Sequence, residues 1–158
     1  MKHYPENIPD ILASHSLWLA KKGGMRADFR SCDLSGISFA GADLRKARFQ
    51  HAQLEKANFE GAQLEGANFF LARLCNANLK KAHCKDAFFL FANMTNAKVD
   101  ENCLKDATLF GANLSGAVPI YNFRLWMRAN PMLMMASYMI LLIMAMSFGA
   151  EIFIRFFL

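Results

Sequence analysis

Residues 42–66 read ADLRK ARFQH AQLEK ANFEG AQLEG, five successive pentapeptides that each begin with Ala and carry Leu or Phe two places later. The same spacing of a large apolar residue, or one close to it in size, runs from Phe29 to Leu114. A period of five matches neither the 3.6-residue turn of a helix nor the two-residue alternation of a strand. The segment is therefore predicted to be a structural repeat.

Four of these segments, 42–44, 57–59, 67–69 and 112–114, show the pattern most clearly as Ala, then Asp or Asn, then Leu or Phe. They resemble the pentapeptide-repeat family, and about eighteen successive units follow the pattern. The resemblance implies an all-β solenoid, a right-handed quadrilateral β-helix in which four pentapeptides make one coil. This chain would then have about four and a half coils, stacked at roughly 4.8 Å.

The chain divides into four predicted segments: an N-terminal capping helix (1–26), a pentapeptide-repeat β-helix (27–118), a juxtamembrane linker (119–131) and a hydrophobic helix (132–158). The cap is expected from Ile8 to about Lys22, with Asp10 as its N-terminal cap and Gly23 as its stop. Such a helix would cover the open edge of the first coil. His15 and Trp18 are assigned to this capping role rather than to chemistry.

The charges of the repeat are nearly balanced, with eleven Lys and Arg against ten Asp and Glu in residues 27–118. Residues twenty apart should lie above one another, so the column Glu60, Lys80, Asp100 is expected to form an exposed ladder of alternating sign, as is the pair Lys81 and Glu101. The family's DNA-mimicking members bind type II topoisomerases and need a strongly acidic surface, which this chain lacks. Direct binding of nucleic acid is not expected either, because the cations are interleaved with acids.

One face of the repeat carries large apolar residues at outward positions, where the repeat itself needs none. These residues are the candidate interaction face: Phe70, Leu71, Phe88, Leu90, Phe91 and Phe110. A contiguous exposed apolar patch usually marks an interface. Its occupant could be the chain's own C-terminal segment, a second copy or a foreign partner.

The cysteines and histidines show no motif that would hold a metal or a cofactor. Cys32 and Cys84 occupy inward positions, Cys75 and Cys103 are expected to face outward, and no CxxC pair exists. Neither a zinc site nor a disulfide is therefore expected, and a reducing compartment fits best. Asn102 stands where the repeat has an inward Ala, so it must find hydrogen-bond partners inside or turn outward.

The composition changes after Pro119. Residues 129–150 contain no charged side chain and are long enough to cross a bilayer. The preceding residues suit the membrane interface, with aromatic and cationic anchors at Tyr121, Arg124, Trp126 and Arg128. A single-pass tail anchor with the repeat in the cytoplasm is expected, and no N-terminal signal peptide is evident. The alternative is a helix buried against the Phe70 side of the repeat or against another subunit.

These features favour a non-catalytic, membrane-anchored scaffold that presents a rigid rod to a protein partner, either another copy or a membrane protein. The sequence contains no recognisable catalytic triad, phosphate loop or metal motif, so no enzymatic activity and no cofactor are expected. Three alternatives stay open: a topoisomerase-binding DNA mimic of the quinolone-resistance type, a soluble oligomer whose tail is a subunit-interface helix, and a secreted effector or toxin-immunity component.

Overall fold

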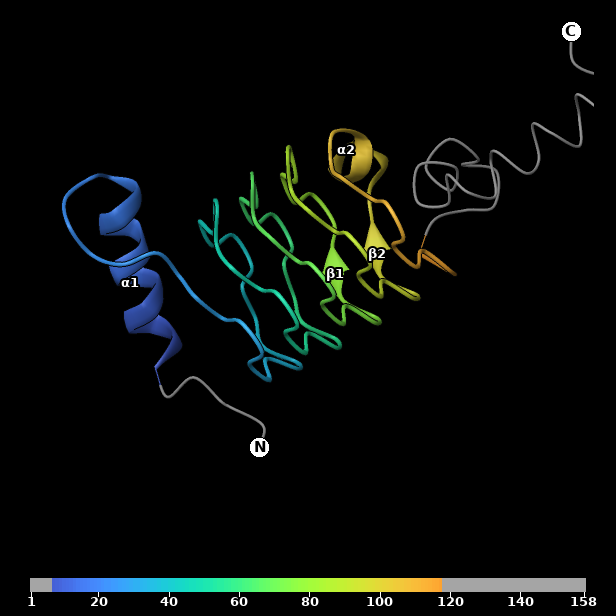
Figure 1. Ribbon diagram of the computed structural model, residues 1–158, viewed down its shortest axis with the longest axis horizontal. Helices are drawn as coiled ribbons and strands as arrows, with labels where there is room; N and C mark the ends of the chain where they lie inside the picture. The colour runs from blue at the N-terminus through green and yellow to red at the C-terminus, as the bar shows by residue number, and fades with distance from the viewer. Residues whose placement is uncertain (1–6, 118–158) are drawn as a thin grey trace, which may run out of the picture.

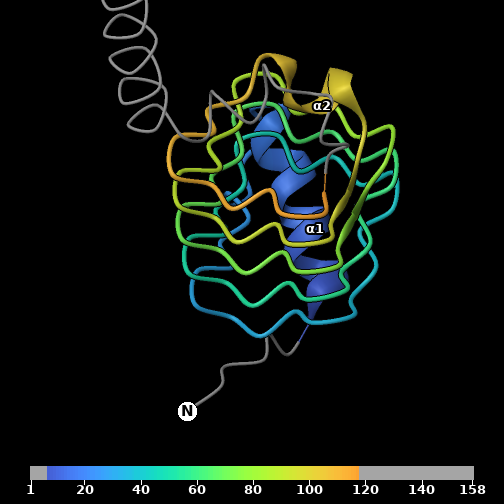
Figure 2. The same cartoon turned by 90° about the vertical axis from the view of Figure 1, so that its right-hand side faces the viewer.

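The computed structural model describes residues 7–117, which form a rod of stacked coils with a helix across one end (Figure 1). Its regular elements are helix α1 (Ile8–Leu19), strands β1 (Asn78–Leu79) and β2 (Lys98–Val99), and helix α2 (Glu101–Lys105). Seen along the stack, successive coils overlie one another and α1 lies behind the far end (Figure 2). The predicted linker (119–131) and hydrophobic helix (132–158) lie outside the described residues.

The coils are held together by parallel backbone pairing between residues twenty apart. Arg48 pairs with Asp28 on one side and with Asn68 on the other. Its N–H donates to the carbonyl of Ala27 at 3.0 Å, and its carbonyl accepts from the N–H of Phe29 at 2.8 Å. Twenty residues per coil means four pentapeptides per coil, as the sequence predicted. Pairing lasts only one or two residues on each side, so β1 and β2 are the only extended strands among residues 7–117.

A tight turn every five residues explains the period. The N–H of each unit's first residue donates to the carbonyl of the large residue before it, as Ala47 does to Leu44 at 2.9 Å. The intervening corner residue has a positive φ, for example 62° at Lys46 and 59° at Lys56. This is the third position of a type II turn, which favours Gly or Asn. Each corner turns the chain into the next side of the coil.

The interior is a narrow stack of buried Phe, Leu and Ala side chains. The Phe69 ring is stacked between the Phe49 ring, at 4.8 Å between centroids, and the Phe89 ring, at 4.9 Å. Phe59 meets Phe69 edge-on from another side of the coil at 5.8 Å. Because each unit contributes one large and one small side chain, the core is filled without a second layer of structure.

The predicted N-terminal helix is present as α1, with different ends. Asn7, not Asp10, is the N-cap, and its side chain accepts the Asp10 N–H at 3.3 Å. The helix ends at Leu19, and Lys21, with φ of 57°, already has the left-handed conformation expected at Gly23. Gly24 has a separate role, because a Cβ at this position would collide with the backbone carbonyl of Ser14 in α1. The backbone can therefore pass this close to the helix only if residue 24 is Gly.

The second helix, α2, interrupts the repeat and corrects two predictions. A helical turn shifts which residues point inward, so Asn102 is exposed while Cys103 and Leu104 are buried. The expectation that Cys103 faces outward is therefore wrong. Cys103 forms a disulfide with Cys84, with their Cα atoms 4.9 Å apart. The expected absence of disulfides is wrong as well, and with it goes the argument for a reducing compartment. Backbone pairing resumes where the Asp86 N–H donates to the Asp106 carbonyl at 3.1 Å.

Candidate functional site

The six predicted interaction residues lie on one side of the rod. We define the Phe70 face as the five pentapeptides 27–31, 47–51, 67–71, 87–91 and 107–111, which lie above one another through the pairing of residues twenty apart. Four of the six side chains are among the large exposed apolar groups of residues 7–117: Leu71, Phe88, Phe91 and Phe110, each 43–46% exposed. Phe70 and Leu90 are half-buried between them. The structure thus brings the predicted set together.

The rings of the Phe70 face form a continuous chain. His51 meets Phe70 edge-on at 5.6 Å, Phe70 meets Phe91 at 6.2 Å, and Phe91 meets Phe110 at 5.6 Å. Edge-to-face contacts at these distances are attractive beyond simple burial of area. The exposed side chains are therefore ordered against one another, and they present a single apolar surface over the C-terminal coils.

Two of these side chains occupy corner positions that disfavour them. Leu71 has φ of 55° and Phe91 has φ of 53°, the left-handed region in which a bulky residue is strained by about 1–2 kcal/mol. Other corners on the rod are Gly, such as Gly61 and Gly66. The fold needs no apolar side chain at this position, because it points away from the core. The same positive φ occurs at polar corners such as Lys46 and Lys56, so what sets Leu71 and Phe91 apart is an exposed apolar side chain that the core does not require.

Gly111 is the corner residue directly above Phe91 on the next coil, and it makes room for that ring. A Cβ at Gly111 would collide with Phe91 Cδ1 and Cε1. The Phe91 ring therefore lies against the backbone of Gly111. Any other residue at position 111 would force the ring to move. This contact fixes the direction of Phe91 on the face.

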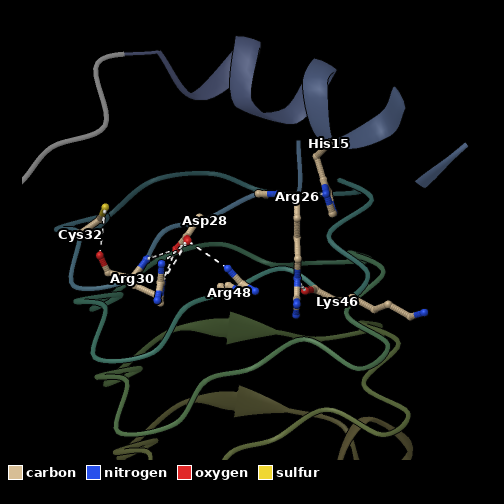
Figure 3. A network of polar contacts seen from close by, with 8 residues as sticks. His15, Arg26, Asp28, Arg30, Cys32, Lys46 and Arg48 are labelled. Carbon is tan, nitrogen blue, oxygen red and sulfur yellow. Dashed lines mark hydrogen bonds and ion pairs between the residues drawn. The ribbon is translucent and has the colours of Figure 1, made fainter. Parts of the chain in front are cut away.

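The other end of the Phe70 face is charged (Figure 3). Arg30 donates through Nε and Nη2 to the Asp28 carboxylate, at 2.8 and 2.7 Å, and Arg48 Nη1 approaches the same carboxylate at 3.4 Å. The hydrogen bond from Arg30 lowers the pKa of Asp28 from its usual value, against a smaller effect of burial. Sequence reasoning missed this cluster because it did not compare Asp28 with Arg48, twenty residues on in the same column, and did not consider residues two apart such as Asp28 and Arg30.

The predicted ladder of Glu60, Lys80 and Asp100 shows no ion pair within residues 7–117. Glu60 accepts from the Asn78 amide at 3.2 Å, and Asp100 accepts the backbone N–H of Lys81 at 2.6 Å. The ion pairs of this region instead join Asp28 to Arg30 and Arg48, Asp43 to Arg45, and Glu55 to Arg73. Asp28, Asp43 and Glu55 are therefore paired with arginines on the surface of the rod, whereas Glu60 and Asp100 accept from neutral groups.

The cap is attached through His15, which is completely buried. The N–H of Ala27, the first residue of the repeat, donates to His15 Nδ1 at 3.1 Å, and the Trp18 ring stacks on the imidazole at 5.5 Å. The guanidinium of Arg26 lies 5.9 Å from the Trp18 ring centroid, and its Nε donates to the Lys46 carbonyl (Figure 3). His15 and Trp18 thus lie where α1 meets the first coil, the position that the predicted capping role requires.

A hollow of about 590 Å³ lies beside α2, over the disulfide. Its lining mixes cations such as Lys81 and Lys85 with acids such as Asp100 and Asp106. No group of three or more His, Cys, Asp or Glu suited to a metal ion occurs within residues 7–117. The mixed lining indicates no particular ligand.

The predicted membrane-interface anchors Tyr121, Arg124, Trp126 and Arg128 lie outside the described residues, as does the predicted span. Within residues 7–117 there is no helix long and apolar enough to cross a membrane.

Comparison with known proteins points to one family. A model described as pentapeptide repeats matches residues 25–61 with eight copies. A pentapeptide-repeat protein from the Arabidopsis thaliana thylakoid lumen is 31% identical, over 63% of this chain and 76% of its own, with a TM-score of 0.42.

Two further solved structures are similar. HetL, a pentapeptide-repeat protein of Nostoc sp. strain PCC 7120 involved in regulating heterocyst differentiation, is 30% identical over 59% of this chain and 40% of its own, with a TM-score of 0.32. QnrB1, a plasmid-mediated fluoroquinolone resistance protein, is 21% identical over 58% of this chain and 55% of its own, with a TM-score of 0.28. No curated protein matches the chain.

Proposed function

Because the chain belongs to the pentapeptide-repeat family, whose fold is a right-handed quadrilateral β-helix, we propose that it is a non-catalytic scaffold that displays a protein-docking surface beside a membrane. The Phe70 face is the docking surface, and residues 132–158 are the anchor. The repeat between them is a rigid rod, since every coil is bonded to its neighbours along its length. Its cytoplasmic placement rests only on the cations that precede the span, because the Cys84–Cys103 disulfide is atypical of cytoplasmic proteins.

The Phe70 face carries this proposal. Its apolar side chains are exposed, ordered by ring contacts and in two cases held at strained corners. A soluble rod would gain stability and solubility from Gly or Asn at those corners. A partner that covers the face accounts for both the exposure and the strain.

Local pairing of the charged side chains supports a non-catalytic role. Asp28, Asp43 and Glu55 each lie in an ion pair on an open wall, which leaves them neutralised and solvated. A general acid or base is instead expected in a cleft whose burial and neighbours adjust its pKa toward neutrality.

The anchor rests on the sequence alone. Residues 129–150 carry no charge, and Arg124 and Arg128 precede them with Tyr121 and Trp126. Cations on the side of the repeat favour a cytoplasmic repeat, and the aromatic residues suit the interface.

Membrane extraction tests the anchor. We expect the full chain to stay in the membrane pellet after washing with alkaline carbonate and a chain ending at Ala117 to be released. A full-length Leu141→Asp, Ile143→Asp variant should also be released, because each Asp costs about 2.5–3.5 kcal/mol at the centre of a span. Leu141→Val, Ile143→Val is the matched control and should stay in the pellet. Release of the unmodified full chain would contradict anchoring.

Stability measurements test whether the Phe70 face serves the fold. In Leu71→Gly and Phe91→Gly the loss of partly buried area is offset by relief of corner strain, so we expect each to change the free energy of unfolding by less than about 1 kcal/mol. Urea titration followed by circular dichroism measures it. A loss above about 2 kcal/mol in either variant would mean that the exposed side chain is structural and would remove the main support for docking.

A further inference from the structure

We infer that the occupant of the Phe70 face is the same face of a second copy of this chain, so that two rods lie side by side and parallel. The inference deepens the proposed function, and it rests on membrane anchoring only for the orientation of the two rods. The contact surface itself consists of described residues and is argued from them.

The spacing of the side chains favours a second copy. Phe70, Leu90 and Phe110 stand one above another because their coils are paired, and coils are about 4.8 Å apart. A second rod has the same spacing, so its side chains can pack between these along the whole patch.

The order of charge and apolarity along the face selects the parallel arrangement. Asp28, Arg30 and Arg48 occupy the first coils, and the apolar patch occupies the later ones. An antiparallel pair that overlaps along the whole face would press arginines of one copy onto Phe91 and Phe110 of the other, which buries charge against apolar surface. An antiparallel pair staggered to match the apolar patches would leave both charged clusters without a counterpart. A two-fold axis along the rod places the apolar patches together.

The charged ends also suit a parallel pair. The two Asp28–Arg30–Arg48 clusters would meet each other, and each contains both signs of charge. Acid from one copy can therefore face a guanidinium of the other. A partner of strong net charge of either sign would find no such complement on this face.

Membrane anchoring fits the same orientation. Both chains leave the rod at the same end, after Ala117, so both anchors can enter one bilayer only if the rods are parallel. Two-dimensional confinement also raises the effective concentration of the second copy.

The size of the patch indicates how strong the contact is. Four side chains about 45% exposed, of roughly 200 Å² each, present roughly 350 Å² of apolar surface. Stable interfaces bury about 800 Å² per partner, so the patch is the centre of a modest contact. We expect a dimer in the membrane and dissociation on dilution in detergent.

Cysteine crosslinking of the full chain in membranes tests the inference. The background is Cys75→Ser, because Cys75 is the free cysteine of residues 7–117 that is partly exposed, whereas Cys32 is buried. Gln50→Cys places a thiol on the Phe70 face, and a parallel pair brings the two copies of position 50 together. Glu60→Cys is the matched control, at the same place in the pentapeptide and the same coil but ten residues, or two sides, away.

With a short bismaleimide we expect a covalent dimer from Gln50→Cys and at least about tenfold less from Glu60→Cys. Adding Phe110→Ser to Gln50→Cys should lower the dimer yield about tenfold, because it removes a central apolar contact. Equal yields from positions 50 and 60 would overturn the inference. So would the absence of a dimer, including the case in which position 50 is covered by the chain's own tail or links to a different protein.

The two proposals fail separately. A carbonate-resistant chain that gives no dimer at position 50 keeps the anchor and removes the second copy. A chain that carbonate releases but that still crosslinks at position 50 keeps the second copy and removes the anchor.

Discussion

Replacement of Phe69 by Ala is expected to lower the free energy of unfolding by about 3–5 kcal/mol. Phe69 is fully buried, stacked between Phe49 and Phe89, and touched edge-on by Phe59. The core is one side chain wide on each side, so no second layer can move in to fill the cavity. The total free energy of unfolding of a typical domain is only about 5–15 kcal/mol, so this loss is a large fraction of it.

Urea titration of the full chain in mild detergent, followed by circular dichroism, measures this loss. Phe69→Leu should cost much less, because Leu occupies the equivalent inward position at Leu64 and Leu74. Phe110→Ala is the matched control, since it removes the same atoms from an exposed ring and should cost under about 1 kcal/mol. Equal losses at Phe69 and Phe110 would mean that inward and outward positions are wrongly assigned.

The five-residue period predicted the solenoid because it places one turn and two inward side chains in every unit, and this constraint leaves few alternatives. The same period failed at α2. Five residues there form a helical turn, so Cys103 turned inward beside Cys84 and Asn102 turned outward. A strict register placed Cys103 outward, which was wrong, and the disulfide was missed as a consequence; of the two alternatives left open for Asn102, the structure shows the outward one.

The apolar half of the candidate site was predictable for the same reason that the fold was. Residues twenty apart share a face, which was enough to group Phe70, Leu90 and Phe110. Leu71 and Phe91 also left a signal, since the corner position of other units holds Gly, Asn, Ser, His or a charged residue and not an apolar one. The Asp28–Arg48 pair lies twenty residues apart and was open to the same column argument, whereas the Asp28–Arg30 pair and the bond from Ala27 to His15 depend on side-chain conformation and left no periodic signal.

Acidification below about pH 6.5 is expected to loosen the cap. His15 Nδ1 accepts a hydrogen bond from the Ala27 N–H. When the imidazole is protonated, Nδ1 carries a hydrogen and can no longer accept, so this bond is lost and two N–H groups face each other. Burial lowers the pKa of His15 below its usual value, helped by the charges of Arg26 and Arg45 and opposed by Asp43 and the Arg45 carbonyl. The unfolded cap therefore binds the proton more readily than the docked cap does.

The sign and the range of this effect follow from that difference. The stabilisation is complete above about pH 6.5, the ordinary value for His, and is lost as the pH falls toward the lowered pKa, by up to about 1.4 kcal/mol per pH unit. The pKa values of Asp28 and Asp43 are also lowered, by hydrogen bonds from Arg30 and Arg45, so those acids affect stability only at lower pH. Measurements between pH 7.5 and pH 5 therefore leave these two carboxylates out, and the histidine variants below separate His15 from the other histidines.

Fluorescence of Trp18, which stacks on His15, reports docking of the cap in a Trp126→Phe background. His15→Ala should cost about 2–4 kcal/mol at pH 7.5, because it empties a buried site and leaves the Ala27 N–H without its acceptor. His15→Gln can keep an acceptor without titrating, so its stability should not change between pH 7.5 and pH 5. His51→Gln, at an exposed histidine, should keep the full pH dependence. A His15→Gln variant that loosens with acid as the unmodified protein does would show that another group is responsible.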